Sequence, residues 1–324
     1  MGGGSNLILG LDVGGTKSAV VVGSADGRIL AREVFPSLTQ RGPGAMIEQF
    51  LARANHLRSK FPGIGTVGVS IGGPMDALRG IIQSPPHLPG WDNIPLADRL
   101  ADALSPPGSP PIRVVVEHDA IACLLAEWLW GAARGATHCA YLTCGTGFGA
   151  GLMIDGRPVR GPAGQSPEFG HVRLAADGPV MFGKAGCCES FCGGDGISLL
   201  AGFMFPTRFA GPVQPAELVA LRNSGDAQAA AVLAESARRC GQAAAILADL
   251  FCPQVIVLGS LARRFGQAWV EAVRESFAAE ALPVNSASTR IVPYALDDMQ
   301  DLSPIAAAVY RLGVFPNNPG VAVT

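Results

Sequence analysis

Two glycine turns have the composition of phosphate-binding loops, and they are Gly14-Gly15-Thr16 and Gly145-Thr146-Gly147. Glycine lets a ligand approach the backbone closely, and successive N–H groups of such a turn can face one concave side. Thr16 and Thr146 add hydroxyl donors. Taken singly, either turn fits an ordinary hairpin as well. Their repetition, each time between two apolar segments, favours phosphate binding and predicts a nucleotide as ligand.

Two aspartates stand where a phosphoryl transfer would need them. Asp12 lies at the end of the apolar segment before the first turn. A carboxylate there repels phosphate unless a cation lies between them, so we expect a water-mediated contact of Asp12 to Mg²⁺. Asp119 follows a predicted strand at 112–116 and begins a predicted helix at 119–131, so its carboxylate can accept the proton of an attacking hydroxyl. A plain helix cap is the alternative for Asp119.

The elements that must position these residues follow the same order twice. Strand, glycine turn and strand are predicted at 6–23 and again at 138–155. Each turn lies between two strands, which excludes the Rossmann fingerprint and the Walker loop, whose glycines open onto a helix. The repeat predicts two domains of like topology that face each other across a cleft.

The remaining pattern alternates apolar strands with amphipathic helices. Strands are predicted at 28–35, 66–71 and 254–258, and helices at 44–60, 226–250, 265–279 and 303–312. Residues 76–112 are rich in proline, and we expect them to be irregular.

Composition excludes several functional classes. Of the 324 residues, 48% are hydrophobic and 15% are charged, so the chain can bury sizeable cores and is not disordered. The formal net charge is −2 and the basic residues are scattered, which excludes nucleic acid and anionic membrane surfaces as partners. Eight cysteines in a chain whose start lacks a secretory pattern predict reduced thiols and a cytoplasmic location.

The motifs resemble the ROK family of sugar kinases and repressors, within the superfamily of sugar kinases and actin. Asp12 to Lys17 resembles the family's first phosphate motif, and Gly145 to Gly149 its second. Further resembling segments keep the family's order: Gly72-Gly73-Pro74, Leu88-Pro89-Gly90-Trp91, Glu117-His118-Asp119-Ala120, Glu168-Phe169-Gly170-His171, Gly186-Cys187-Cys188-Glu189 and Val255 to Ser260. The chain begins close to the first strand, which favours the enzymes over the repressors that carry an added helix-turn-helix.

The resemblance implies an α/β fold of two ribonuclease-H-like lobes, each a mixed five-stranded sheet flanked by helices, with an interlobe cleft. A smaller lobe would span 1–117, with the last helix, about 303–315, packing back on it. A larger lobe would span 118–302. The family also implies a homodimer.

The implied activity is ATP- and Mg²⁺-dependent phosphorylation of a sugar hydroxyl, on a hexose or N-acylhexosamine. Asp119 matches the catalytic base. Phosphate and ATP would contact Asp12, Gly14, Gly15, Thr16, Lys17, Gly145, Thr146, Gly147, Gly259 and Ser260. The sugar would contact Gly72, His87, His118, Asp119, Glu168, His171 and Glu189. A non-catalytic relative that binds sugar or nucleotide, and a kinase with another donor such as polyphosphate, are the alternatives.

One departure from the family concerns its zinc site, which the resemblance assigns to a histidine and three cysteines. His171 and Cys187 match two of these ligands, whereas Val180 and Phe182 stand where the other two thiolates belong. A structural zinc needs four ligands. We therefore expect no zinc and expect apolar packing in its place.

The second departure concerns two family asparagines that face the sugar. His87 and His118 replace them, beside Leu88-Pro89-Gly90-Trp91 and beside Asp119. Histidine is larger than asparagine and can carry a charge, and a positive imidazole at 118 would make Asp119 a weaker base. Both an altered substrate and a relaxed, inactive site fit this pair of changes.

Overall fold

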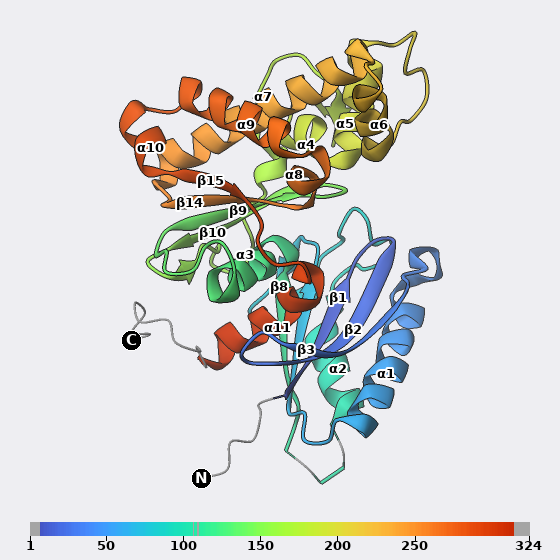
Figure 1. Ribbon diagram of the computed structural model, residues 1–324. Coiled ribbons are helices and arrows are strands. Elements are labelled where there is room, and N and C mark those ends of the chain that lie inside the picture. Colours follow the sequence, from blue (N-terminus) through green and yellow to red (C-terminus); the bar gives the residue numbers. More distant parts are fainter. Residues whose placement is uncertain (1–6, 106, 109, 314–324) are drawn as a thin grey trace. The chain divides into compact units, whose positions relative to one another are not determined.

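The computed structural model describes residues 7–105, 107–108 and 110–313, which form two compact units (Figure 1). The first unit contains the described residues up to Gly135 together with Val159–Ser166 and the chain from Leu296. The second contains Ala136–Pro158 and Pro167–Ala295. The first unit therefore extends beyond the boundary at 117/118 drawn from the sequence, because the helix that begins at Asp119 packs against the last helix.

The first unit is built on a five-stranded sheet in the order β3-β2-β1-β4-β8. Its strands are β1 (Leu7–Val13), β2 (Lys17–Ser24), β3 (Ile29–Pro36), β4 (Thr66–Ile71) and β8 (Arg113–His118). β1, β2 and β3 pair antiparallel, whereas β1, β4 and β8 pair parallel. The sheet is thus mixed, with its parallel half at the β4 and β8 side.

Helices cover both faces of this sheet. They are α1 (Gly42–Lys60), α2 (Leu96–Leu104), α3 (Asp119–Trp130) and α11 (Met299–Leu312), with a 3₁₀ turn at Thr39–Arg41. Leu9 and Leu11 share a core with residues of α1 and α2. On the opposite face α11 comes so close to β4 that a Cβ at Gly68 would lie 1.9 Å from the carbonyl oxygen of Pro304. Glycine at 68 therefore gives α11 its place on the sheet.

The segment 76–112 contains more structure than its prolines predicted. It forms α2 and a small sheet of β5 (Met75–Asp76), β6 (Ile81–Ile82) and β7 (Ile94–Pro95). Leu96, Leu100 and Leu104 recur every four residues and are all buried, which gives α2 one apolar face. The prolines flank this helix rather than interrupt it, so the prediction of an irregular segment was wrong there.

The second unit repeats the sheet order, as β11-β10-β9-β14-β15. The strands are β9 (Cys139–Cys144), β10 (Phe148–Ile154), β11 (Arg157–Pro158), β14 (Val255–Leu258) and β15 (Arg290–Pro293). As in the first unit, β9, β10 and β11 pair antiparallel, whereas β14 and β15 run parallel to β9. The predicted α/β fold with two mixed five-stranded sheets is confirmed.

Helices and one small hairpin complete the second unit. The helices are α4 (Cys188–Cys192), α5 (Gly194–Met204), α6 (Pro215–Asn223), α7 (Ala227–Phe251), α8 (Ser260–Phe265), α9 (Gln267–Glu280) and α10 (Pro283–Ser288), with a 3₁₀ turn at Phe169–His171. The hairpin pairs β12 (Val180–Met181) with β13 (Lys184–Ala185). The carboxylate of Asp226 caps α7 by accepting from the N–H groups of Gln228 and Ala229, each at 2.9 Å.

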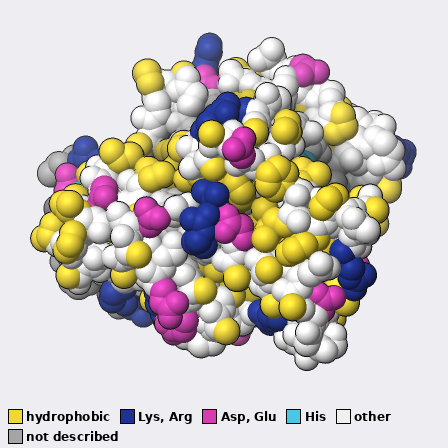
Figure 2. All heavy atoms as spheres, turned by 90° about the horizontal axis from the view of Figure 1, so that it is seen from above, with side chains coloured by type: hydrophobic (Ala, Val, Ile, Leu, Met, Phe, Trp, Pro, Cys, Tyr) yellow, Lys and Arg dark blue, Asp and Glu magenta, His cyan; other side chains and the backbone are white. Residues whose placement is uncertain are grey.

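Charged side chains of both signs are scattered over the face of the molecule that Figure 2 shows. On the face drawn in Figure 2, lysine and arginine side chains alternate with acidic and apolar ones and form no continuous basic stripe. Among the residues described, no helix combines the length and apolar character that crossing a membrane requires.

Candidate active site

Three parallel strands of the first unit end side by side. The last residues of β1, β4 and β8 pair across the sheet, Val13 with Ile71 and Ile71 with His118. From these ends the chain continues into the first glycine turn, into Gly72 and into Asp119. Ligands of α/β sheets bind outside the carboxyl ends of parallel strands, so this edge is the candidate site of the first unit.

The first glycine turn is held by a serine that the sequence did not single out. A Cβ at Gly14 would lie 2.5 Å from the carbonyl oxygen of Lys17, so the turn requires glycine there. Ser37 is buried; its Oγ donates to the carbonyl of Gly14 at 2.6 Å and its N–H to the carbonyl of Thr16 at 3.0 Å. Gly15, Thr16 and Lys17 are exposed. The turn is thus fixed from beneath and accessible from outside.

Asp119 stands at the first turn of α3 and reaches solvent. Its side chain is 49% exposed, and its Oδ1 accepts from the N–H of Ala120 at 2.6 Å. A Cβ at Gly72 would lie 4.0 Å from the other oxygen, Oδ2. The predicted base and the predicted glycine therefore meet at the same edge, and one carboxylate oxygen is directed to Gly72.

His118 is the N-cap residue of α3, and both His118 and Asp119 contact the N–H of Ala120. Its imidazole is buried, and Nδ1 accepts from the N–H of Ala120 at 3.3 Å. The same Nδ1 lies 3.4 Å from Asp119 Oδ1, so the imidazole, the carboxylate and the N–H of Ala120 meet at the start of α3.

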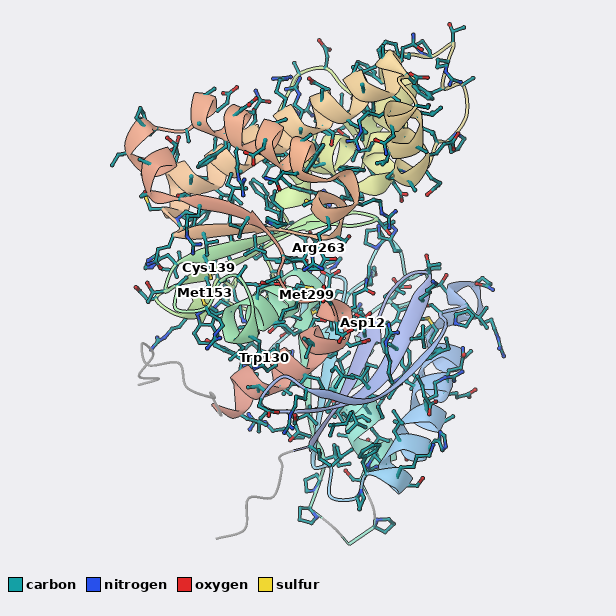
Figure 3. The ribbon with its side chains drawn as sticks, viewed as in Figure 1. Asp12, Trp130, Cys139, Met153, Arg263 and Met299 are labelled. Atoms are coloured by element: carbon teal, nitrogen blue, oxygen red, sulfur yellow. The ribbon has the colours of Figure 1, made fainter. Side chains whose placement is uncertain are left out.

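Asp12 lies on the side of β1 that faces α11 (Figure 3). Burial raises the pKa of its carboxyl to about 8, and the charges of Asp119 and Asp301 add to the rise while Arg32 opposes it. Arg32 itself forms an ion pair with Asp301 at 2.6 Å. A carboxylate crowded by like charges is stabilised when a divalent cation binds nearby, so these residues fit Mg²⁺ held by Asp12 through water.

A buried ion pair holds the end of β8, which precedes the predicted base Asp119. Glu117 is 1% exposed; its Oε1 accepts from Arg160 Nη1 at 2.7 Å and from the N–H of His118 at 2.9 Å. The second guanidinium nitrogen of Arg160 binds the other carboxylate oxygen. Arg160 comes from Val159–Ser166, the segment that joins the first unit although its neighbours belong to the second. This fork is a contact that sequence motifs did not reveal.

His87 lies beside the first glycine turn. A Cβ at Gly15 would lie 3.3 Å from the Cβ of His87 and 3.4 Å from its carbonyl oxygen. The side chain of His87 is exposed. The predicted sugar contact is therefore next to the predicted phosphate contact within this unit.

The second glycine turn links β9 and β10 and is held by α5. The N–H groups of Gly194 and Asp195 donate to the carbonyls of Gly145 and Thr146 at 2.8 and 3.0 Å. Thr146 is exposed. As in the first unit, the carbonyls of the turn accept hydrogen bonds from another segment of the protein, here from the N–H groups at the start of α5.

Gly259 and Ser260 lie next to this turn, at the carboxyl end of β14. Ser260 Oγ donates to the carbonyl of Cys144 at 2.8 Å, and the N–H of Gly259 donates to the carbonyl of Leu142, also at 2.8 Å. These bonds bring the predicted nucleotide-binding turn after β14 together with Gly145.

Glu189 also belongs to the second turn, although the sequence placed it at the sugar. Its Oε2 accepts from the N–H of Phe148 at 3.1 Å, and a Cβ at Gly147 would lie 3.2 Å from both carboxylate oxygens. A Cβ at Gly170 would lie 3.1 Å from Oε2, so the segment of Glu168 and His171 adjoins the same carboxylate. Glu189 therefore joins the predicted sugar-binding segment to the phosphate turn.

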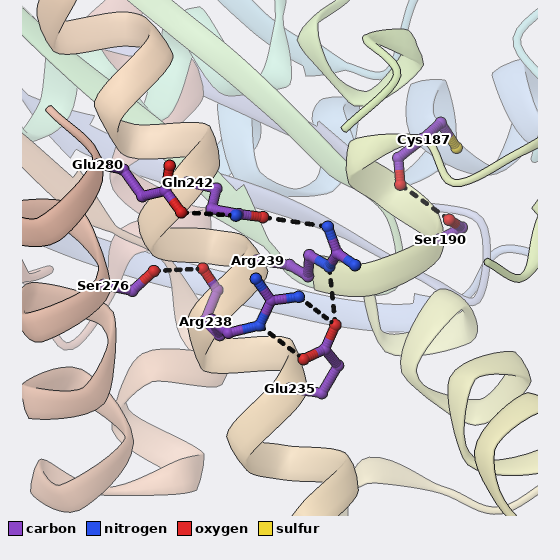
Figure 4. A network of polar contacts seen from close by, with 8 residues as sticks. All are labelled: Cys187, Ser190, Glu235, Arg238, Arg239, Gln242, Ser276 and Glu280. Atoms are coloured by element: carbon purple, nitrogen blue, oxygen red, sulfur yellow. Dashed lines mark hydrogen bonds and ion pairs between the residues drawn. The ribbon is translucent and has the colours of Figure 1, made fainter. Parts of the chain in front are cut away.

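The short helix α4, which carries Glu189, is held at its start and by α7, and Figure 4 shows the Ser190–Cys187 bond and the Arg239–Glu235 pair. Ser190 Oγ donates to the carbonyl of Cys187 at 2.8 Å, which closes its first turn. Arg239 of α7 lies 4.6 Å from the centroid of the Phe191 ring and is paired with Glu235 at 2.7 Å. The position of Glu189 thus rests on packing between α4 and α7.

His171 has an aromatic partner in place of metal ligands. Its ring stacks on Phe182, with centroids 4.2 Å apart and an angle of 23° between the planes. Within the described residues, no three His, Cys, Asp or Glu side chains are grouped so that they could hold a metal ion. The residues at this position do not fit a structural zinc.

The predicted site residues fall into two groups, one in each unit. In the first unit Asp12, the residues Gly14 to Lys17, Gly72, His87, His118 and Asp119 lie at or beside one sheet edge. In the second, the residues Gly145 to Gly147, Gly259, Ser260 and Glu189 gather at the corresponding edge, with Glu168 and His171 on an adjoining turn.

Two like-ordered sheets, each with a glycine turn after its first strand, place the protein in the two-lobed superfamily of sugar kinases and actin. A family model described as the ROK family matches residues 8–303. The chain therefore belongs to the ROK family.

Relatives within the family include several sugar kinases. A glucokinase of Thermotoga maritima is 29% identical over 291 residues, which are 85% of this chain and 88% of that protein. An N-acetylmannosamine kinase of Escherichia fergusonii, 30% identical over 78% of the chain and 82% of its own length, and a xylose repressor of Caldicellulosiruptor bescii, 26% identical over 66% of the chain and 54% of its own length, also match.

Solved structures agree in fold over nearly the whole chain. A ROK hexokinase from Thermus thermophilus matches with a TM-score of 0.79 and 30% identity, covering 95% of this chain and 99% of that one. A ROK family glucokinase from Streptomyces griseus, in complex with glucose and AMPPNP, matches with a TM-score of 0.77 and 26% identity over 93% and 98%.

Proposed function

We propose that the protein is an ATP- and Mg²⁺-dependent kinase that phosphorylates a hydroxyl of a hexose or an N-acylhexosamine. The observation that carries the proposal is the position of Asp119. Its half-exposed carboxylate stands at the carboxyl end of β8, beside Gly72 and at the same sheet edge as the first glycine turn. The glucokinases and N-acetylmannosamine kinase among the relatives support the choice of substrate class.

In this proposal the two glycine turns bind the phosphates of ATP. Exposed N–H and hydroxyl groups at Gly15, Thr16 and Thr146 act as donors, and Lys17 adds positive charge. Gly259 and Ser260 contact the adenosine side of the nucleotide. Asp12 would hold Mg²⁺ through water, and the bound ion would supply positive charge against the transferred phosphoryl group.

Asp119 accepts the proton of the sugar hydroxyl as that hydroxyl attacks the γ-phosphate, and ADP leaves. Its Oδ2, which lies toward Gly72, is the acceptor, since Oδ1 is bonded to the backbone of α3. Gly72, His87 and His118 contact the sugar from the first unit, and His118 donates from Nε2 because Nδ1 caps the helix. Glu168, His171 and Glu189 contact the sugar from the second.

ADP release measured by a coupled assay over a panel of hexoses and N-acylhexosamines tests this function. At least one sugar should stimulate turnover, and Asp119→Asn should lower kcat by about 10²- to 10⁴-fold, the usual contribution of a general base. Asp102→Asn, at an exposed site on α2, is the matched control and should leave kcat unchanged. No sugar-stimulated turnover with ATP or with polyphosphate would disprove kinase activity.

One observation favours a second candidate, a relative that binds sugar without turnover. His118 commits Nδ1 to the cap of α3, so the pocket offers an imidazole donor where the family has an asparagine side chain. Calorimetric titration separates the two candidates. Sugar binding that is measurable while turnover is absent, and that is unaffected by Asp119→Asn, selects the binding protein.

A further inference from the structure

The hairpin β12–β13 occupies the sequence position of the family's metal loop, yet its side chains point to a different use. Val180 and Phe182 stand where the family pattern has thiolates, and they are 62% and 39% exposed. Cys187, which matches a ligand, is fully buried. Valine and phenylalanine carry no atom that binds zinc, so two of the four ligands that a structural zinc needs are missing from this loop.

Phe182 has a backbone conformation that is unfavourable for its residue type. Its φ is 52°, and Gly183 follows with a φ of 70°, so both central residues of this two-residue hairpin are left-handed. Asparagine or glycine is the usual choice at the first position, and a bulky residue there costs on the order of 1 kcal/mol. The retained phenyl ring therefore calls for a compensating contact.

That contact is the imidazole of His171. The two rings are stacked 4.2 Å apart, and Lys184 of the same hairpin donates from Nζ to the carbonyl of His171 at 2.6 Å. The ring of His171 is therefore held by the first residue of the two-residue turn, and its backbone by the residue that directly follows the turn.

Backbone hydrogen bonds join the hairpin to the segment that follows His171. The N–H of Leu174 donates to the carbonyl of Gly186 at 2.8 Å, and the N–H of Cys188 donates to the carbonyl of Val172, also at 2.8 Å. Arg173 and Cys187 form an antiparallel bridge. These bonds cross-link the chain on both sides of the hairpin, which is what a metal ion would do in a zinc-bound loop.

We propose that Phe182 is a positioning residue that orients His171 without zinc, so that the hairpin replaces the family's metal site by an aromatic stack. The proposal rests on the proposed function only in that His171 contacts the sugar. The ring of Phe182 fixes the imidazole, Lys184 fixes its backbone, and the β12–β13 turn carries both.

The metal side of the proposal is tested on the purified wild-type protein without any assay of activity. Metal analysis should find no stoichiometric zinc, and a chelator should leave the Tm unchanged. One zinc per chain, or a fall in Tm with chelator, overturns the proposal.

Restoring the two missing cysteines tests whether the β12–β13 hairpin occupies the position of the family's zinc loop. Val180→Cys combined with Phe182→Cys completes a set of four ligands with His171 and Cys187, and Zn²⁺ alone is the probe. The double variant should bind one zinc per chain, whereas Val180→Cys alone, which keeps the stack, should bind none. A double variant that takes up no zinc overturns the equivalence of the two loops.

The stacking of Phe182 on His171 is tested by replacing Phe182 with residues that have or lack an aromatic ring. Phe182→Ala should remove the ring-current shift of the His171 ring protons in NMR spectra and raise the KM for sugar roughly three- to tenfold with kcat little changed, the range of one aromatic pair. Phe182→Tyr should keep both values. Phe182→Gly should raise KM as much as Phe182→Ala does, but its Tm should be higher than that of Phe182→Ala, because glycine adopts the left-handed backbone conformation at position 182 without strain. An unshifted His171 signal in Phe182→Ala overturns the stack even if the protein proves to have no kinase activity.

Discussion

At the scale of single residues, three carboxylates of the first unit, those of Asp12, Asp119 and Asp301, lie close enough for two of them to affect the pKa of Asp12. Burial, together with Asp119 and Asp301, raises the pKa of Asp12 to about 8. Such a group keeps its proton in the metal-free native state at neutral pH. Binding of Mg²⁺ favours the ionised form, so nucleotide and metal should bind with release of a proton.

Asp12→Asn should therefore make the metal-free protein more stable in alkaline solution while lowering activity. The folded-state pKa of about 8 exceeds the ordinary 3.8, so the contribution of neutral Asp12 is fully present below 3.8 and is lost as pH rises through 8. Urea unfolding in the presence of a chelator, at pH about 6 and about 8.5, measures the change. The wild type should lose stability relative to Asp12→Asn between these values, and parallel pH profiles would contradict the assigned pKa.

The cysteines differ sharply in reactivity for reasons of burial. Cys252 is exposed and Cys123 is partly exposed, while the other six are buried. Burial raises the pKa of Cys139 and of Cys188 to about 12, so their reactive thiolates are scarce. Iodoacetamide should alkylate Cys252 first in the native protein, with Cys123 slower.

Mass spectrometry of time-resolved alkylation checks this order. The six buried thiols should react only after denaturation, and Cys252→Ser should remove the fast phase. Early labelling of Cys144, which precedes the second glycine turn, would show that this turn opens in the native protein.

Sequence motifs pointed to residues whose type is unusual at the end of a strand. They did not point to residues whose contacts are made only by the folded chain. The glycine turns, Asp12 and Asp119 could be proposed as site residues because each combines a special residue with the end of an apolar strand. Ser37 could not, since a serine after a strand is common and its partners, Gly14 and Thr16, are distant in sequence. Glu189 was found, but its contact with the second turn depends on how α4 packs.

At the scale of elements, the sequence predicted the strands of the first sheet and β9, β10 and β14 of the second, because alternation and buried runs are local properties, whereas β11 and β15 were not predicted. The helices α4, α5 and α6 were not predicted, since α4 has only five residues and they lie in a glycine- and proline-rich region. Their importance lies in what they hold: α5 binds the second turn from beneath, and α4 carries Glu189.

The fork between Arg160 and Glu117 is the element-scale contact whose loss should be most damaging. Arg160→Met leaves a buried carboxylate without its partner at the end of β8, which costs on the order of 3–5 kcal/mol of stability. Because Glu117 also binds the N–H of His118, the variant should lower kcat through Asp119. Denaturant unfolding and the sugar-kinase assay measure the two effects.

The double variant Glu117→Gln with Arg160→Met provides the decisive comparison. It removes the uncompensated charge and should recover much of the lost stability, giving a coupling energy of a few kcal/mol in a double-mutant cycle. Arg79→Met, at an exposed position, is the control and should change little. Additive effects of the two single changes would contradict a direct pair.

At the scale of the whole molecule, neither unit is a continuous stretch of chain. The chain changes unit after Gly135, after Pro158, after Ser166 and before Leu296. The sequence boundary at 117/118 placed α3 with the larger lobe, since a strand end looks like a natural division. The packing of α3 on α11, a helix far along the chain, is a non-local contact that one sequence does not reveal.

Ligand binding should stabilise this molecule by mass action, which gives a test of the proposed function that needs no turnover. A ligand at 100 times its Kd adds about 2.7 kcal/mol, and with an unfolding entropy of about 2.1 cal/mol/K for each of 324 residues the Tm rises by about 4 °C. Mg²⁺ with AMPPNP should produce such a rise in scanning calorimetry. Thr146→Val should reduce the rise, because it removes an exposed hydroxyl donor from the second glycine turn, while Thr207→Val, at an exposed site away from both turns, should leave it intact. An unchanged Tm with the nucleotide at saturating concentration would mean that the two glycine turns do not serve a nucleotide, and the same experiment repeated with polyphosphate would then identify the donor.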